Sequence, residues 1–295
     1  MTGRHNFVDG DGSSISVVIP ACNRWSLLER ALDSVRKQTC SASEVLVIDD
    51  GSNKPVSDSL RNSFPSVQFL RQENKGVASA RNLGIKQSTC DWIALLDSDD
   101  EWEPTKLEKQ MAFLEKLPEL QAIHTGERWI RNGNEVTPPA YLDKSSDLLW
   151  ERSLRHCLIC PSSVLIHSSV FETVGLFDEK LSVCEDYDFW LRLLLEQEIG
   201  LVDEKLVIKH GGHSDQLSTT IWGMDRFRIM ALQKILSNPL LSNDCRIKAI
   251  EVIQEKCGIL AQGAEKRGKF DDAQKYKNLS DQYSIELGKQ PTLTA

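Results

Sequence analysis

The nine residues from Trp92 to Asp100 read WIALLDSDD, an apolar run followed by three carboxylates. A short continuous apolar run is typical of a strand that is buried on both faces of a sheet. Carboxylates crowded at a strand end repel one another unless a cation or hydrogen-bond donors compensate, and hard oxygen ligands suit Mg²⁺ or Mn²⁺. The stretch therefore predicts a buried strand that ends in a metal site. The alternative is a solvated loop leading into a helix capped near Asp100 or Glu101.

Earlier apolar runs predict further strands of the same sheet, separated by segments with helical spacing. The predicted strands are 15–19, 45–48, 67–70 and 92–96, and the predicted helices between them are about 27–35 and 77–87. Strands that alternate with helices imply βαβ units and a mostly parallel sheet flanked by helices. Pro20 is expected to end the first strand. Ligands of open α/β sheets bind beyond the carboxyl ends of the strands, so residues 23–24, 49–50 and 97–100 are expected to meet at one rim.

The remainder of the chain predicts additional elements and a division into three parts. The predicted helices are 104–117, 170–174 and 188–195, and the predicted strands are 122–130, 163–166 and 205–209. Residues 1–14 are rich in Gly, Ser and Asp and predict a flexible tail, residues 15–220 form the α/β domain, and residues 221–295 form a C-terminal helical extension. Residues 257–276 resemble half of a tetratricopeptide hairpin. Only one copy is present, which favours a helical cap over a solenoid.

Composition excludes several classes of protein. The net charge of −8 and the pI near 5.4 argue against a nucleic-acid partner, because duplexes are bound largely through Lys and Arg. No apolar run approaches the roughly 20 residues that span a bilayer, and the polar start has no signal-peptide core. We therefore expect a cytoplasmic protein without a transmembrane segment, with peripheral association at the inner face of the membrane left open. The single C-x-x-C, Cys157 and Cys160, has no second pair, so free thiols are favoured over zinc binding or redox chemistry.

Five motifs in order then resemble the family 2 glycosyltransferases with the GT-A fold, over about residues 16–218. The motifs are PACNR (20–24), VIDDGS (47–52), ENKGVASARNLG (73–84), LLDSDD (95–100) and FDEKLSVCEDYDFWLRL (177–193). The resemblance implies an inverting enzyme that transfers a sugar from a nucleotide diphosphate sugar, with UDP favoured, to the hydroxyl of a carbohydrate or lipid-linked acceptor. It also implies Mn²⁺ or Mg²⁺ as cofactor, and a role in cell-surface polysaccharide or lipopolysaccharide synthesis.

The resemblance also assigns site residues. Pro20, Asn23, Arg24, Asp49, Ser52, Arg81, Asp97 and Ser98 would bind the nucleotide sugar, Asp99 and His210 would hold the metal with His213 as an alternative, and Asp186 would be the catalytic base beside Glu185. Asp100 is expected to support the metal ligand. From the residues alone, Gly51 allows a tight turn and Arg81 offers a rigid fork of donors that suits phosphate oxygens. Glu185 and Asp186 also suit the positive end of the helix that they precede.

Three other classes of protein compete with this interpretation. A sugar-phosphate nucleotidyltransferase would carry a Gly-rich phosphate loop after the first strand, and a dehydrogenase would carry G-x-G-x-x-G there. Residues 20–24 contain no glycine, which disfavours both. A catalytically inactive nucleotide-sugar binding module remains open, because intact acidic motifs do not by themselves prove turnover.

Overall fold

A central β-sheet organises the computed structural model, which describes residues 14–144, 148–212 and 221–288. The strands are β1 (Ile15–Ala21), β2 (Glu44–Asp50), β3 (Gln68–Gln72), β4 (Trp92–Leu95), β5 (Glu101–Trp102), β6 (Ala122–Arg131), β7 (Asn134–Val136), β8 (Leu165–His167) and β9 (Gly200–Gly211). Their order is β3-β2-β1-β4-β8-β6-β9-β5, and β7 pairs with β6. The sheet is parallel over β3-β2-β1-β4, as predicted. Beyond β4 it is mixed, because β8 runs antiparallel to both β4 and β6.

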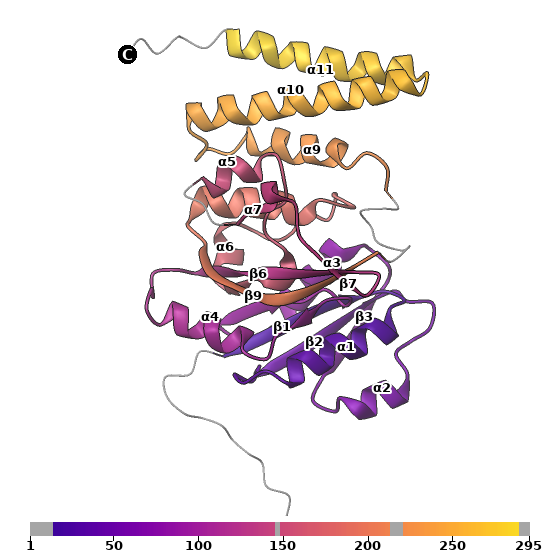
Figure 1. The fold of residues 1–295 in the computed structure, drawn as a ribbon, viewed down its shortest axis with the longest axis vertical. Coiled ribbons are helices and arrows are strands. Elements are labelled where there is room, and N and C mark those ends of the chain that lie inside the picture. The colour runs from indigo at the N-terminus through magenta and orange to yellow at the C-terminus, as the bar shows by residue number, and fades with distance from the viewer. Residues whose placement is uncertain (1–13, 145–147, 213–220, 289–295) are drawn as a thin grey trace, which may run out of the picture.

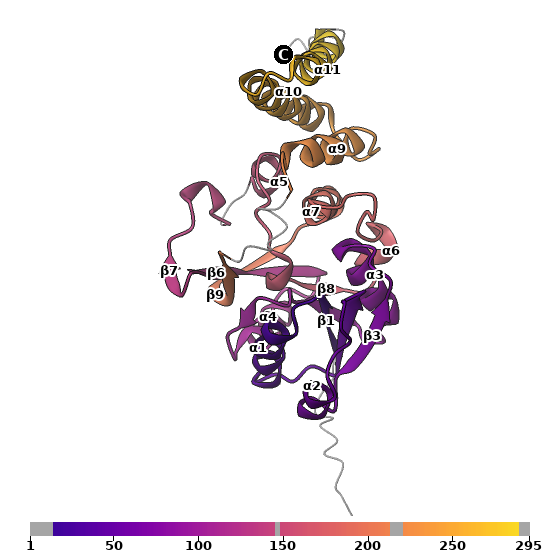
Figure 2. The same cartoon turned by 90° about the vertical axis from the view of Figure 1, so that its right-hand side faces the viewer.

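Helices cover both faces of this sheet (Figures 1 and 2). The helices are α1 (Trp25–Arg36), α2 (Asp58–Ser63), α3 (Val77–Gln87), α4 (Lys106–Leu114), α5 (Leu149–Ser153), α6 (Val170–Thr173), α7 (Glu185–Glu196), α9 (Asp225–Ile235), α10 (Asn243–Lys266) and α11 (Phe270–Gly288). The alternation of β1 explains the layers, because successive side chains of a strand point to opposite faces. Val17 and Ile19 join one apolar cluster with Leu28 of α1, whereas Val18 joins the other with Ala80 of α3.

A close approach of backbone to sheet sets the position of α3. A Cβ built on Gly84 would lie 2.2 Å from Cγ1 of Val18, a distance that real Cβ atoms do not reach. The absence of a side chain at Gly84 therefore lets α3 lie close against β1. This contact helps to hold the first turn of α3 at the carboxyl end of the sheet, where the polar motifs converge.

One predicted strand end was wrong, and the alternative interpretation of residues 97–100 does not hold. Pro20 does not end the first strand, because β1 continues to Ala21. On the β4 side, the backbone carbonyl of Val18 accepts a hydrogen bond from the N–H of Leu96. Pro20 lies two residues later, beyond the end of β4. Proline has no N–H, but at this position no strand partner requires one. No helix starts near Asp100 either. Glu101 and Trp102 form β5, which pairs with β9, and the next helix begins at Lys106.

The C-terminal helices stack outward from the sheet at one end of the molecule (Figure 1). α9 packs on α7 through an apolar cluster that includes Leu191 and Leu232, and α10 adds Ile253 to the same cluster. α10 and α11 lie side by side, as the hairpin-like sequence predicted. The predicted tail and the 220/221 boundary fall largely on residues 1–13 and 213–220, outside the described residues. No helix in the described ranges is both long and apolar enough to cross a membrane.

Candidate active site

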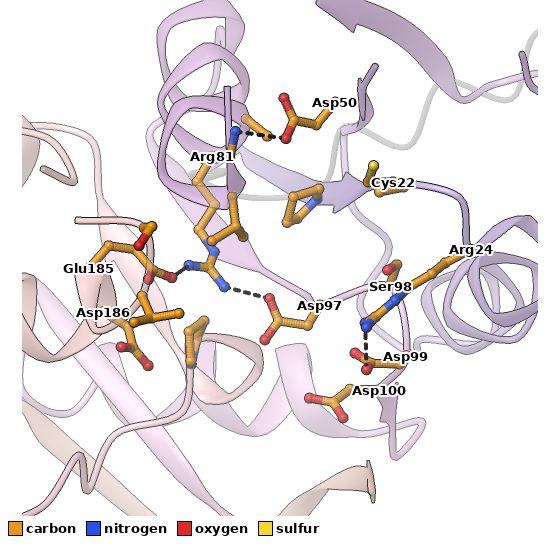
Figure 3. A pocket seen from close by; sticks show the side chains of 18 of the residues that line it. Cys22, Arg24, Asp50, Arg81, Asp97, Ser98, Asp99, Asp100, Glu185 and Asp186 are labelled. Atoms are coloured by element: carbon orange, nitrogen blue, oxygen red, sulfur yellow. Dashed lines mark hydrogen bonds and ion pairs between the residues drawn. The ribbon is translucent and has the colours of Figure 1, made fainter. Parts of the chain in front are cut away.

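A cavity of about 550 Å³ opens at the carboxyl ends of β1, β2 and β4, between the first turns of α3 and α7 (Figure 3). Ten of the twelve predicted site residues line it: Pro20, Asn23, Arg24, Arg81, Ser98, Asp97, Asp99, Glu185, Asp186 and His210. The prediction that separate motifs meet at one rim is therefore confirmed in position. Asp49 and Ser52 do not line the cavity.

Asp49 and Ser52 instead shape the loops around the cavity. Asp49 is 4% exposed, and its carboxylate accepts bonds from the backbone N–H of Ser52 at 2.8 Å and from Arg71 Nη1 at 3.0 Å. Ser52 Oγ accepts the backbone N–H of Asn23 at 2.8 Å, where Asn23 takes the left-handed conformation with φ 56°. Gly51 makes the predicted tight turn with φ 71°. Asp49 thus holds Ser52 in place, and Ser52 in turn fixes the loop that follows β1.

Asp50, which was predicted at the rim but given no role in the site, is the carboxylate of this turn that lines the cavity. Its Oδ1 accepts the backbone N–H of Lys75 and its Oδ2 that of Gly76, each at 2.9 Å, so it satisfies donors just ahead of α3. Alternation along β2 places Asp49 and Asp50 on opposite sides, but sequence alone does not show which side faces the ligand.

Arg81 joins two parts of the cavity wall. Its Nη1 donates to Glu185 Oε1 at 2.5 Å and its Nη2 to Asp97 Oδ1 at 2.6 Å (Figure 3). Burial of this 3%-exposed residue lowers the pKa of the guanidinium, but the carboxylates of Asp97 and Glu185 outweigh that effect and raise it above its ordinary value. Arg81 is therefore a permanent cation that ties β4 to α7.

Each carboxylate after β4 has a different partner. Asp99 Oδ2 pairs with Arg24 Nη1 at 2.8 Å. Asp100 accepts a bond from Ser162 Oγ at 2.7 Å and from the backbone N–H of His210 at 3.2 Å. Burial raises the pKa of Asp100. The repulsion expected within this motif is thus relieved by donors from four distant segments.

The donor set at the cavity wall fits a divalent cation that is held partly by the substrate. Within residues 14–144, 148–212 and 221–288, no three or more His, Cys, Asp or Glu side chains converge as an all-protein metal site would require. Asp97 and Asp99 supply hard carboxylate oxygens, with side chains 28% and 13% exposed. Mg²⁺ is commonly held by one or two carboxylates together with substrate phosphates, and these two residues match that mode.

His210 lies at the cavity edge on β9, with its ring directed to a neighbouring carboxylate. Its Nε2 lies 2.6 Å from Glu101 Oε1. The predicted metal role of His210 stays a prediction. His213 falls outside the described residues.

Glu185 and Asp186 open α7 and point to different neighbours. Cys184 before them takes the left-handed conformation, φ 63°, and turns the chain into the helix. Burial and the adjacent Asp186 carboxylate raise the pKa of Glu185, against the opposing pull of Arg81. Asp186 accepts the backbone N–H of Tyr187 at 2.7 Å and the thiol of Cys157 at 3.3 Å. Glu185 is therefore committed to Arg81, whereas Asp186 keeps lone pairs for another donor.

One cavity residue and one contact of Asp186 escaped the sequence prediction. Lys209 lines the cavity, and the nearby Cys160, Glu127 and Asp100 raise the pKa of its ammonium against the effect of burial. Its place on a predicted strand next to His210 was the only available signal. All eight cysteines carry free thiols, as predicted, and burial raises the pKa of Cys157, so this thiol stays protonated as it donates to Asp186.

The fold and the cavity define the chain as a GT-A-type α/β domain. The solved structure of S. aureus TarS 1-349 in complex with UDP-GlcNAc is similar, with a TM-score of 0.66, 15% sequence identity, and coverage of 91% of this chain and 92% of that one. At the level of sequence, the profile described as Glycosyl transferase family 2 matches residues 16–174. The chain belongs to glycosyl transferase family 2. The predicted fold and family are therefore confirmed.

Relatives by sequence place this domain within longer proteins. An uncharacterized glycosyltransferase of Rickettsia prowazekii is 31% identical over 211 residues, which cover 70% of this chain and 66% of that protein. The chondroitin synthase of Escherichia coli is 27% identical over 261 residues, which cover 81% of this chain and 36% of that protein. The match spans 66% or less of the length of each Rickettsia relative.

Proposed function

We propose that this chain is an inverting glycosyltransferase that moves a sugar from a nucleotide diphosphate donor to an acceptor hydroxyl. The observation that carries the proposal is the convergence on one cavity of Arg81, Asp97, Asp99 and Asp186, which lie on three separate elements. The charge of a phosphate-bearing donor calls for a cation and a metal site, for which Arg81 and the pair Asp97 and Asp99 are the candidates. The displacement calls for a base, for which Asp186 is the candidate.

The donor is proposed to be a UDP-sugar. Support comes from the similar structure of S. aureus TarS, which was solved with UDP-GlcNAc and with UDP. The cavity that opens at the carboxyl ends of β1, β2 and β4 is where ligands of open α/β sheets bind. Asp50, Cys22 and Arg24 lie on one side of it and Asp186 on the other (Figure 3).

The proposed mechanism is a single displacement at the anomeric carbon, so the configuration inverts. Asp186 accepts the proton of the attacking hydroxyl as general base. The guanidinium of Arg81 holds Asp97 and α7 in position through its two ion pairs. Asp97 and Asp99 would hold Mn²⁺ or Mg²⁺, which when bound neutralises charge that grows on the leaving diphosphate.

The acceptor and pathway are proposed from relatives. The chain is similar to the chondroitin synthase of E. coli and to a putative colanic acid biosynthesis glycosyl transferase of E. coli, and both names refer to polysaccharides. We place this chain in the synthesis of a cell-surface polysaccharide or lipopolysaccharide. A cytoplasmic location with peripheral contact to the inner face of the membrane stays a prediction.

A thermal-shift screen of UDP-, GDP- and dTDP-sugars with and without Mn²⁺ tests the donor. A ligand at 100 times its dissociation constant stabilises the folded state by about 2.7 kcal/mol, enough to raise the melting temperature measurably. We expect a Mn²⁺-dependent rise with UDP-sugars that Asp99→Ala removes and that Glu119→Ala, a change at an exposed carboxylate, retains.

Turnover is measured with the same donors as release of UDP without and with added acceptors. Release that depends on Asp186 supports the transferase. A thermal shift with no UDP release under any condition would mean a catalytically inactive binding module, and no shift with any donor would reject the proposal.

A further inference from the structure

The short 3₁₀ helix Pro161–Ser163 contacts the acidic turn of residues 97–100 from within the core. Its middle residue, Ser162, is fully buried and does not line the cavity. The hydroxyl of Ser162 accepts the backbone N–H of Asp97 at 3.1 Å and donates to Asp100 Oδ2 at 2.7 Å. One side chain therefore joins both ends of the turn that carries the proposed metal ligands.

We propose that Ser162 is a positioning residue of this transferase, which holds residues 97–100 in the conformation that presents Asp97 and Asp99 to a cation shared with the donor diphosphate. The inference rests on the proposed function and adds a residue that touches neither the cation nor the donor. Three observations carry it: the register of two strands, the double closure of the turn, and the contrast with the neighbouring Ser163.

The register of β4 and β8 explains why a side chain takes this place. The two strands pair antiparallel with Ala94 opposite Leu165, and the same register continued along the chain would set Ser162 opposite Asp97. β8 begins only at Leu165, and residues 161–163 form the 3₁₀ helix instead. The hydroxyl of Ser162 therefore supplies the acceptor that a strand carbonyl would otherwise offer to the N–H of Asp97.

The same residue ties the turn to β5 and closes it a second time. The carbonyl of Ser162 accepts Trp102 Nε1 at 2.7 Å. Within the turn, the N–H of Asp100 donates to the carbonyl of Asp97 at 3.0 Å, so the hydroxyl of Ser162 is a second link between the same two residues. Asp99 lies inside this doubly closed turn. The position of its carboxylate therefore depends on the closure.

The carboxylates and the backbone of the turn are held by different groups. Arg81 pairs with Asp97 and Arg24 with Asp99, and all four residues line the cavity (Figure 3). A cation bound to these two carboxylates would compete with the two arginines. Ser162 contacts the N–H of Asp97 and the side chain of Asp100, so its contacts can persist when the carboxylates change partners.

Ser163 offers a matched contrast in the same short segment. It is as fully buried as Ser162, and its hydroxyl donates to the carbonyl of Cys160 at 2.7 Å. That bond stays within residues 160–163 and does not reach the acidic turn. Ser162→Ala and Ser163→Ala thus each remove one buried hydroxyl, but only Ser162→Ala removes a link across the turn.

Binding of Mn²⁺ to the full chain tests the inference, measured by EPR as loss of the free Mn²⁺ signal at saturating UDP. A sample without protein corrects for Mn²⁺ held by UDP alone. Ser162→Ala should weaken Mn²⁺ binding about tenfold, because loss of a group that orients metal ligands typically costs at least that much affinity. Ser163→Ala should bind Mn²⁺ as the wild type does. Urea unfolding shows whether each variant is folded.

Ser162→Cys provides a second variant, because a thiol is a weaker donor than a hydroxyl and fills similar space. Its affinity for Mn²⁺ should lie between those of the wild type and Ser162→Ala. If Ser162→Ala does not fold, Ser162→Cys compared with Ser163→Cys decides the question in the same way.

The inference is overturned if folded Ser162→Ala binds Mn²⁺ as tightly as the wild type, or if Ser163→Ala loses as much affinity as Ser162→Ala. Equal binding by the wild type and all variants would reject the role of Ser162 and leave the proposed function standing. No uptake of Mn²⁺ by the wild type would reject the metal-dependent step of the proposed function, and this inference with it.

Discussion

Replacing Arg81 by Met is expected to destabilise the protein through the two carboxylates that it would leave unpaired. The guanidinium donates to Glu185 at 2.5 Å and to Asp97 at 2.6 Å, and its side chain is only 4% exposed. Removing one partner of a buried ion pair typically costs 3–5 kcal/mol. Asp97 is 28% exposed and regains water, so we expect a loss near the lower end, about 3 kcal/mol near neutral pH.

The loss should also depend on pH, in a direction that the structure fixes. Burial and Asp186 raise the pKa of Glu185 from 4.5 to about 7, although Arg81 opposes them. The folded protein therefore binds more protons than the unfolded chain between these values, so stability falls as pH rises through this window and levels off above it. Without Arg81 the pKa rises further. Glu185 then stays protonated above pH 7, and the variant keeps losing up to about 1.4 kcal/mol per pH unit.

Equilibrium urea unfolding on both sides of pH 7 measures this difference. The gap between wild type and Arg81→Met should widen as pH rises above 7 and narrow below it. In Arg81→Met combined with Glu185→Gln the widening should disappear, because no charge remains at position 185. A gap that stays constant with pH, or one that persists in the double variant, would falsify the account of Arg81 as the cation that stabilises ionised Glu185.

Three further outcomes are expected. Asp186→Asn should lower kcat by a factor on the order of 10²–10⁴ with little change in donor binding. Glu196→Gln, at the exposed end of the same helix, should leave kcat unchanged. Equal rates for both variants would exclude Asp186 as the base. Gly84→Ala should lower the free energy of unfolding in urea by about 1–3 kcal/mol, because its Cβ meets Val18. The same substitution should cost less when it is made in a Val18→Ala background. Full stability of the single variant Gly84→Ala would contradict the close contact. Asp50→Ala should cost about 0.5–2 kcal/mol through the lost bonds ahead of α3, and a null effect on unfolding would show that water replaces them.

The order of the four strands and the two longer helices in the first hundred residues could be predicted from the sequence, whereas the short helix α2 was missed. Apolar runs marked β1, β2 and β4, and the helix predicted over 77–87 is α3 itself. Burial on both faces of a parallel sheet makes such runs continuous, so the signal is local and strong. The motifs follow these strands directly, and the carboxyl ends of parallel strands meet at one edge of the sheet. Ten predicted residues therefore line one cavity. The antiparallel insertion of β8 was not predictable, because strand direction depends on a connection and not on composition.

The partners of the site residues were decided only by the tertiary structure. Arg81 and Glu185 are 104 positions apart, and Ser162 and Asp100 are 62 apart. No periodicity spans such distances, so the sequence predicted two acidic motifs and an arginine without predicting that the arginine joins them. The same holds for Asp49 and Asp50, whose adjacent carboxylates face opposite sides of β2.

The sequence by itself determined which chemistry is present, and packing determined where each group points. Local patterns fix secondary structure because hydrogen bonds and apolar faces repeat over a few residues. Ion pairs, cavity walls and burial of charge form only when distant segments meet and exclude water. Asp186 illustrates both, since its motif predicted a base, while its place on the cavity wall follows from the packing of Phe189 and Trp190 of α7 against the sheet.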